Sequence, residues 1–281
     1  NKSKGGVAMD GVEFFKPGRP TRSSVAPWRR GVLAILGLIA VAAICFVAHP
    51  AQAQGSNYPT RPIRLVVSFP PGGGIDGVAR LFADKLSTVL HQSVIVENRG
   101  GAAGSIAGKQ VASAAPDGYT ILVGSNSMVI NQIVNPKSGL DVEHDLLAIA
   151  SVAKQATIIV TPPDLKVGSL KELIALAHQR PLTYGTPGAG SIPHLLIDEL
   201  LEKIPGAKMT HVPFQGAGPA LTATIAHQVD VGSMTLPPAI PLVKAGKLHG
   251  LAVTIPARSA ALPQVPTTAE AGFPEVLGTA W

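Results

Sequence analysis

The chain has 281 residues, 46% apolar and 14% charged, so it is long enough to bury a core and too apolar to be disordered throughout. Aromatic residues make up only 4%, which disfavours a surface that stacks nucleobases. The net charge of +6 comes mostly from residues 1–53, because the rest of the chain holds 16 basic and 15 acidic side chains. No basic face is left for a nucleic acid, and we expect no such partner.

The first 53 residues have the pattern of an export signal. Arg29-Arg30 precede an uncharged run over residues 31–48, and Ala51-Gln52-Ala53 follows as a small-x-small cleavage site. This pattern predicts a secretory signal peptide cleaved after Ala53 and a periplasmic protein, with a membrane anchor as the alternative. The only cysteine, Cys45, lies inside this leader. The mature chain would therefore contain neither disulfides nor a catalytic thiol.

After the leader, strands and helices alternate. Residues 63–69 form a β-branched apolar run, and shorter runs follow at 94–96 and 119–123. Between them, apolar residues recur every three or four positions from Val78 to Val89, and residues 104–113 read as a small-residue helix. Such alternation predicts an α/β fold with a mainly parallel sheet.

The second half repeats this alternation, with a boundary near residue 152. Ser169 and Glu172 form a capping box before a helix at 170–179. Strands are predicted at 157–160, 182–186, 208–214, 229–234 and 248–254, and further helices at 194–203, 219–227 and 238–245. We therefore expect a leader (1–53), a first lobe (54–152) and a second lobe (153–281).

Three glycine-rich loops each follow a predicted strand and precede a helix. They span residues 70–76, 185–191 and 215–218. Ligands of open α/β sheets bind beyond the carboxyl ends of strands, and helix N-termini favour anions there. The loops could thus hold a small carboxylate without a charged side chain, although each glycine by itself is equally consistent with an ordinary turn.

Other kinds of site have weaker support. The segment 100–108 is not a P-loop, because Ala103 replaces the first glycine and Gln110 follows Lys109. The histidines are scattered and no H-E-x-x-H motif occurs, so we expect no metal and no cofactor. Asp76 is interpreted as a helix N-cap or a ligand contact. Asp230 either faces a crevice or holds a loop, and His194 could line a cleft, cap a helix or pack.

These segments together resemble the Bug family, the extracytoplasmic substrate-binding proteins of tripartite tricarboxylate transporters. The similarity runs from about Tyr58 to Trp281. The matching segments include YP–PIR (58–64), FPPGG (69–73), ENRGGAAG (97–104), APDGYT (115–120), YGT (184–186), GS (190–191), VPF (212–214) and VD (229–230).

The resemblance implies a two-lobed periplasmic binding fold, with mainly parallel sheets flanked by helices. It implies a non-enzymatic, monomeric receptor that captures a small carboxylate, such as a di- or tricarboxylate, between its lobes. The receptor would deliver this ligand to the membrane permease of a tripartite transporter. On matching positions, the ligand-binding residues would be Phe69, Pro71, Gly73, Asp76, Ser125, Thr186, Gly188, Gly190, Ser191, Phe214, Gly216 and Asp230.

The chain departs from the family pattern in two places and in length. Phe214-Gln215 stands where family members often carry Tyr and a basic residue, and Ala226-His227 replaces a usual glycine pair. Family chains continue for roughly fifty residues beyond the equivalent of Trp281 and return to the first lobe. We therefore expect the C-terminal part of the first lobe to be absent and some apolar surface to be uncovered.

Two alternative functions stay open at this point. One is a secreted α/β hydrolase or transferase that uses Asp76 and His194. The other is a truncated paralogue without function.

Overall fold

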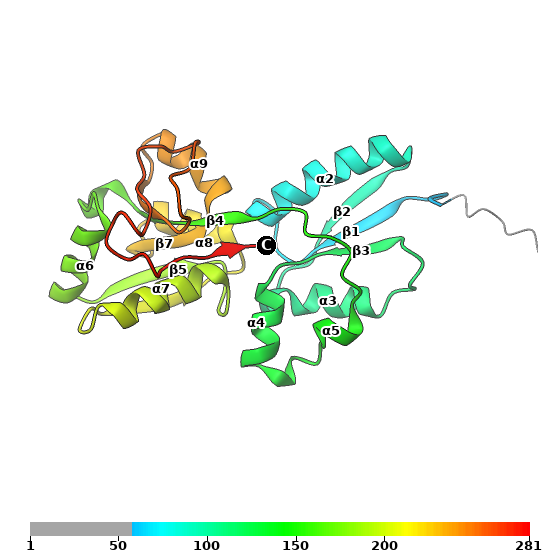
Figure 1. Ribbon diagram of the computed structural model, residues 1–281, viewed down its shortest axis with the longest axis horizontal. Helices are drawn as coiled ribbons and strands as arrows, with labels where there is room; N and C mark the ends of the chain where they lie inside the picture. The colour runs from blue at the N-terminus through cyan, green and yellow to red at the C-terminus, as the bar shows by residue number, and fades with distance from the viewer. Residues whose placement is uncertain (1–57) are drawn as a thin grey trace, which may run out of the picture. The chain divides into compact units, whose positions relative to one another are not determined.

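The computed structural model describes residues 58–281, and the predicted leader with its cleavage site lies outside them. Two β-sheets, each with helices packed on it, make up this part of the chain (Figure 1). The first sheet uses strands that end by residue 123, and the second begins at residue 155. None of the helices in the described residues has the length and apolarity needed to cross a membrane.

The first sheet is parallel, as the alternation predicts, with strand order β2-β1-β3. Its strands are β1 (Ile63–Val67), β2 (Val94–Asn98) and β3 (Thr120–Val123). Helix α2 (Gly74–Leu90) packs on β1 and β2, and α3 (Ser105–Ala112) packs on β1 and β3. Two further helices, α4 (Ser127–Val134) and α5 (Val142–Asp145), follow β3 and were not predicted.

The second sheet is mixed, which corrects the expectation of mainly parallel strands for this half. Its order is β6-β5-β7-β4-β8, and β9 (Thr279–Ala280) pairs with the start of β4. The strands are β4 (Gln155–Thr161), β5 (Leu182–Thr186), β6 (Met209–Pro213), β7 (Val231–Thr235) and β8 (His249–Val253). Strand β4 runs antiparallel to β7 and β8, whereas β5, β6 and β7 are mutually parallel. Periodicity identifies a strand but not its direction, so this reversal was invisible in the sequence.

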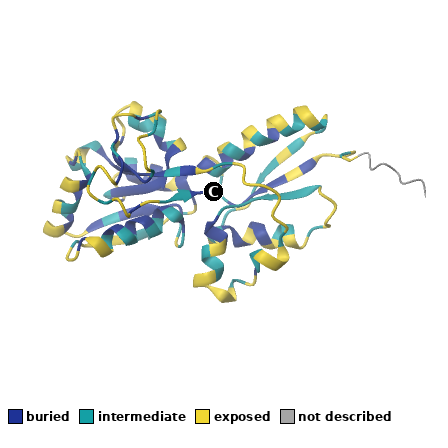
Figure 2. Ribbon diagram, in the orientation of Figure 1, coloured by how far each residue is buried: buried dark blue, intermediate teal, exposed yellow. Residues whose placement is uncertain are grey.

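Helices cover both faces of the second sheet. The helices are α6 (Leu170–Gln179), α7 (Ile192–Lys203), α8 (Ala217–Ile225) and α9 (Leu236–Lys244). Along β4, Ile159 packs into a core cluster with residues of α6 and α7, whereas Ile158 and Val160 pack into a second cluster with α8 and α9. Successive strand residues point to opposite faces, so one strand supplies both cores. Figure 2 shows β4 and β7 mostly in the dark blue of buried residues.

The first sheet buries fewer apolar residues. Its fully packed cluster consists of Ile63, Leu65 and Ala83, with partly buried neighbours around it. Several large apolar side chains between residues 81 and 152 are exposed. They are Leu81, Val89, Ile95, Ile106, Val129, Ile133, Val134, Leu147, Ile149 and Val152.

Candidate functional site

A cavity of about 290 Å³ is formed by loops that follow β1, β2, β5 and β6. These loops leave the carboxyl ends of parallel strands, where α/β sheets bind their ligands. The lining residues are Phe69, Pro70, Gly101, Ala102, Ala103, Asn131, Pro187, Gly188, Ala189, Ser191, Pro213, Phe214 and Gln215. No charged side chain is among them, so this cavity can recognise an anion only through neutral donors.

The loop after β1 is held by a buried carboxylate. Asp76, 4% exposed in the first turn of α2, accepts hydrogen bonds from the Gly72 N–H (3.0 Å), from Arg80 and from Asn98 Nδ2 (2.9 Å). Asn98 Nδ2 also donates to the Phe69 carbonyl (2.9 Å), which fixes Phe69 at the cavity wall. Burial by itself would raise the pKa of Asp76, but these hydrogen bonds lower it below its usual value.

The loop after β2 has an unusual backbone. Gly101, Ala102, Ala103 and Gly104 all have positive φ angles, of 122°, 48°, 51° and 97°. Positive φ is uncommon for alanine, and such conformations persist only where the surrounding structure enforces them, often at ligand sites. Within residues 58–281, the backbone N–H groups of Ala102 and Ala103 meet no hydrogen-bond acceptor. Both alanines line the cavity.

The loop after β5 is held by the side chains of Thr186, at the end of β5, and Ser191, at the start of α7. Thr186 Oγ1 accepts from the Gly188 N–H (3.3 Å), and Ser191 Oγ donates to the Gly188 carbonyl (2.7 Å). The Phe214 N–H donates to the Thr186 carbonyl (2.9 Å), which ties the β6 loop to the β5 loop. The backbone N–H groups of Ala189 and Gln215 have no acceptor in the described part of the chain.

The predicted site residues fall into three groups. Phe69, Gly188, Ser191 and Phe214 line the cavity. A second group lies outside the lining: Pro71, Gly73, Gly190 and Gly216 are in the same loops, and Thr186 is the last residue of β5. Gly216 lies so close to the first loop that a Cβ there would be 3.1 Å from Pro70 Cδ.

Asp76, Ser125 and Asp230 form the third group and do not line the cavity. Asp76 anchors the first loop, although the N-cap position predicted for it belongs to Gly73. Ser125 Oγ accepts from the Ser127 N–H (3.3 Å) at the start of α4.

Asp230 holds the beginning of β5 rather than the loop at its end. It accepts from Arg180 (2.8 Å) and from the Thr183 N–H (2.8 Å). Burial alone would raise the pKa of Asp230, but Arg180 and Thr183 lower it. Of the two roles that the sequence left open for Asp230, the structure therefore favours holding a backbone segment.

The second wall of the cavity was not predicted from the sequence. The segment Gly101–Ala103 belongs to the family motif at 97–104 but carries no predicted site residue, and Asn131 lies on the unpredicted helix α4. The signal was present in the GGAAG run, because clustered small residues allow a backbone to approach a ligand. The hydrolase alternative gains no support, since Asp76 bonds to Arg80 and Asn98 while His194 contacts Asp198 and Gly190. Among residues 58–281, no three metal-binding side chains cluster.

Comparison with known proteins identifies first the fold and then the family. A Rhodopseudomonas palustris protein solved with adipate aligns with a TM-score of 0.77 at 36% identity, over 80% of this chain and 76% of that one. MatC of Rhodopseudomonas palustris, with bound malate, aligns with a TM-score of 0.73 at 32% identity, over 80% and 77%. The chain thus has the two-lobed periplasmic binding-protein fold, as the resemblance predicted.

Sequence comparison gives the family. The model of the tripartite tricarboxylate transporter family receptor matches residues 78–281. BugT of Bordetella pertussis is 37% identical over 255 residues, which cover 89% of this chain and 76% of that protein. The chain belongs to the tripartite tricarboxylate transporter receptor family, and this confirms the resemblance. Members of this family are solute-binding receptors of the periplasm.

Proposed function

We propose that this receptor captures a small carboxylate in the cavity between the four loops and presents it to the permease of a tripartite transporter. The observation that carries the proposal is the pairing of a cavity without charged side chains with four backbone N–H groups that lack an acceptor among the described residues. A carboxylate needs such donors when it leaves water. The adipate and malate in the two related structures belong to the same chemical class.

The lining also favours acids without an ammonium group. A buried ammonium needs an anionic partner, and no Asp or Glu lines the cavity. Phe69 and Phe214 offer apolar surface for the carbon skeleton, while Asn131, Ser191 and Gln215 supply the polar side chains. We therefore expect adipate and malate to bind better than aspartate, which is similar in size to malate but carries an ammonium group.

The proposal includes the organisation and export of the chain. The ligand-binding residues are those predicted above that line the cavity or lie in its loops, and the two lobes span 54–152 and 153–281. The receptor acts as a monomer without catalysis and is released into the periplasm by cleavage after Ala53. N-terminal sequencing of the protein from a periplasmic extract tests the cleavage, and a mature chain that begins elsewhere would refute it.

The binding test is a thermal-shift and calorimetry series with adipate, malate and aspartate. A compound that binds only the folded state adds about 2.7 kcal/mol of stability at a hundredfold excess over its Kd. Saturable binding of adipate or malate supports the proposal. A cooperative unfolding transition that none of these or other small carboxylates shifts would contradict it.

A charge placed at the cavity tests where binding occurs. Ala189 is exposed at the lining, so Ala189→Asp should leave the fold intact and weaken binding of a bound carboxylate about tenfold, by like-charge repulsion. Ala189→Lys should strengthen it. Ala257→Asp, at an exposed alanine in a loop that does not line the cavity, is the matched control and should change nothing. If Ala189→Asp and Ala257→Asp changed the carboxylate affinity equally, the ligand would bind somewhere other than this cavity.

A further inference from the structure

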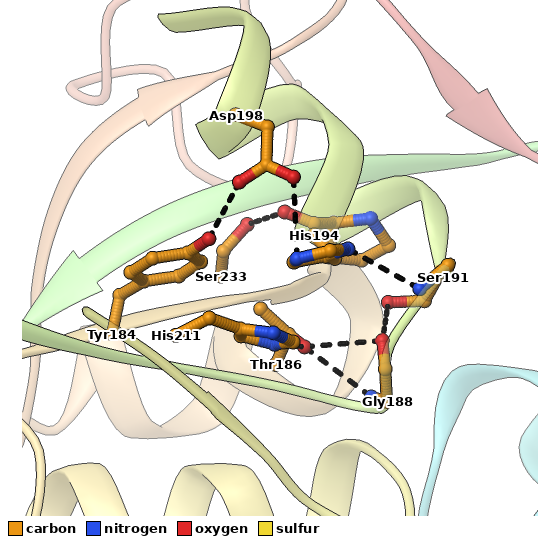
Figure 3. A network of polar contacts seen from close by, with 10 residues as sticks. Tyr184, Thr186, Gly188, Ser191, His194, Asp198, His211 and Ser233 are labelled. Carbon is orange, nitrogen blue, oxygen red and sulfur yellow. Dashed lines mark hydrogen bonds and ion pairs between the residues drawn. The ribbon is translucent and has the colours of Figure 1, made fainter. Parts of the chain in front are cut away.

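Two stacked imidazoles lie behind the cavity loop of the second sheet. His194 is in the first turn of α7 and His211 is on β6, and their ring centroids are 3.8 Å apart at an interplanar angle of 25° (Figure 3). Tyr184 on β5 stacks beside them, 5.0 Å from His211. None of the three lines the cavity. The proposed function therefore gives them no role.

Each imidazole holds one part of the loop. His194 Nδ1 accepts a hydrogen bond from the Gly190 N–H (3.2 Å). His211 Nε2 lies 2.7 Å from Thr186 Oγ1, the same oxygen that accepts from the Gly188 N–H. Gly188 lines the cavity, and Gly190 precedes the lining residue Ser191. Both histidines therefore act on the cavity wall through the backbone.

The hydrogen bond to Gly190 requires a particular protonation state. An imidazole nitrogen accepts a hydrogen bond only while it carries no proton, and both nitrogens of an imidazolium are donors. His194 Nε2 lies 3.2 Å from Asp198 Oδ2, so the neutral ring carries its proton on Nε2 and keeps Nδ1 free for Gly190. A second proton on Nδ1 would point toward the Gly190 N–H. Two donors would then face each other, and the hydrogen bond between them would be lost.

The groups that face the pair determine where a proton goes. They are Tyr184 from β5 and Asp198 from α7. Tyr184 donates to Asp198 Oδ1 (2.6 Å), and burial together with Asp198 raises its pKa, so it stays a neutral donor. Burial, followed by the charge of His194, lowers the pKa of His211 to about 4. The carboxylate that faces the pair, Asp198, lies 3.2 Å from Nε2 of His194.

We propose that His194 and His211 are positioning residues for the cavity loop, and that uptake of one proton by the stacked pair frees Gly190 and weakens ligand capture. Histidine side chains change charge between about pH 5 and 8. Apparent affinity scales with the fraction of molecules in the binding-competent form. When nine in ten pairs are protonated, binding is about tenfold weaker.

The first test needs no ligand. NMR spectra of the purified full chain report the shift and the exchange protection of the Gly190 amide from about pH 7.5 to about pH 5.5. We expect protection at the higher pH and its loss at the lower. His194→Asn keeps an acceptor oxygen near the position of Nδ1 without a titrating group, so it should retain protection at both. His194→Ala should lose protection at both.

The control separates this role from a general effect of acid. His178 is exposed on α6, and His178→Gln should follow the unsubstituted chain at every pH. A Gly190 amide that keeps its protection at about pH 5.5, or that keeps it in His194→Ala, would overturn the proposal.

Calorimetry with adipate and malate then separates this inference from the proposed function, on which its ligand part rests. About tenfold weaker binding at the lower pH, absent in His194→Asn, supports both. Binding that is equal at the two pH values overturns the link to ligand capture. If neither acid nor any other carboxylate binds while Gly190 responds as expected, the loop positioning stands and the proposed function fails.

Discussion

The two sheets differ in how completely their own chain covers them. In the second, alternate residues of β4 enter separate clusters on opposite faces, and both clusters contain many fully buried side chains. In the first, the fully buried apolar residues of the cluster are few, and large apolar side chains on α2, α3 and α4 face solvent. Free energy of folding scales with apolar area removed from water, so stability should be concentrated in the second sheet. The cavity loops come from both.

The largest expected effect is a loss of stability on truncating a buried leucine of the second sheet's core, compared with an exposed leucine that follows the first sheet. Leu200 on α7 is 1% exposed, whereas Leu147 is 90% exposed. Leu200→Ala should lower the free energy of unfolding by about 2–5 kcal/mol, because a cavity replaces packed atoms. Leu147→Ala should change it by less than about 0.5 kcal/mol. Denaturant titration measures both, and similar losses would show that the burial contrast does not govern stability.

The next effect concerns Asp76, which holds the loop after β1. Asp76→Ala removes the acceptor of Gly72, Arg80 and Asn98, and hydrogen bonds to a charged group are worth about 1.5–3 kcal/mol. We expect that loss in denaturant titration, together with weaker binding, because Phe69 depends on Asn98. Asp117→Ala removes an exposed ion pair with Arg61 and an exposed hydrogen bond from the Tyr119 N–H, and should cost about 1 kcal/mol. An equal cost for both would contradict the anchoring role.

Replacing glycine by alanine should affect carboxylate binding differently in the loop after β5 and in the loop after β1. Gly188 has φ +149° and lines the cavity, so a side chain there is strained by about 1–3 kcal/mol. We expect Gly188→Ala to weaken carboxylate binding in calorimetry. Gly73 has φ −85° and an added Cβ would make ordinary contact with Ala217 at 3.9 Å, so Gly73→Ala should bind normally. If Gly73→Ala weakened binding and Gly188→Ala did not, the ligand would bind closer to the loop after β1 than we propose.

The last prediction is a pH dependence of stability that belongs to the second sheet. The pKa of His211 falls to about 4 in the folded state, chiefly by burial, from an unfolded value of about 6.5. The folded form binds fewer protons, so His211 supports stability fully above about pH 6.5 and loses that contribution as the pH falls toward 4. His211→Gln should flatten the change of Tm in this window. If Tm changed with pH as steeply in His211→Gln as in the unsubstituted chain, His211 would not be the source of the pH dependence.

The sequence alone determined most elements of the fold. Runs such as residues 63–67 and the capping box at Ser169 predict a strand and a helix because side-chain period and end chemistry are local properties. The glycine-rich loops and the family resemblance also pointed to three of the four loops that form the cavity.

Only the tertiary structure decided the remaining features. The antiparallel direction of β4 and the roles of Asp76 and Asp230 depend on partners farther along the chain. The positive φ angles of Ala102 and Ala103 also appear only in the folded backbone. The stacking of His194 on His211 joins a helix to a strand that the sequence treats as unrelated segments. Spacing along a chain specifies neighbours within one element, whereas contacts between elements follow from how the sheets pack.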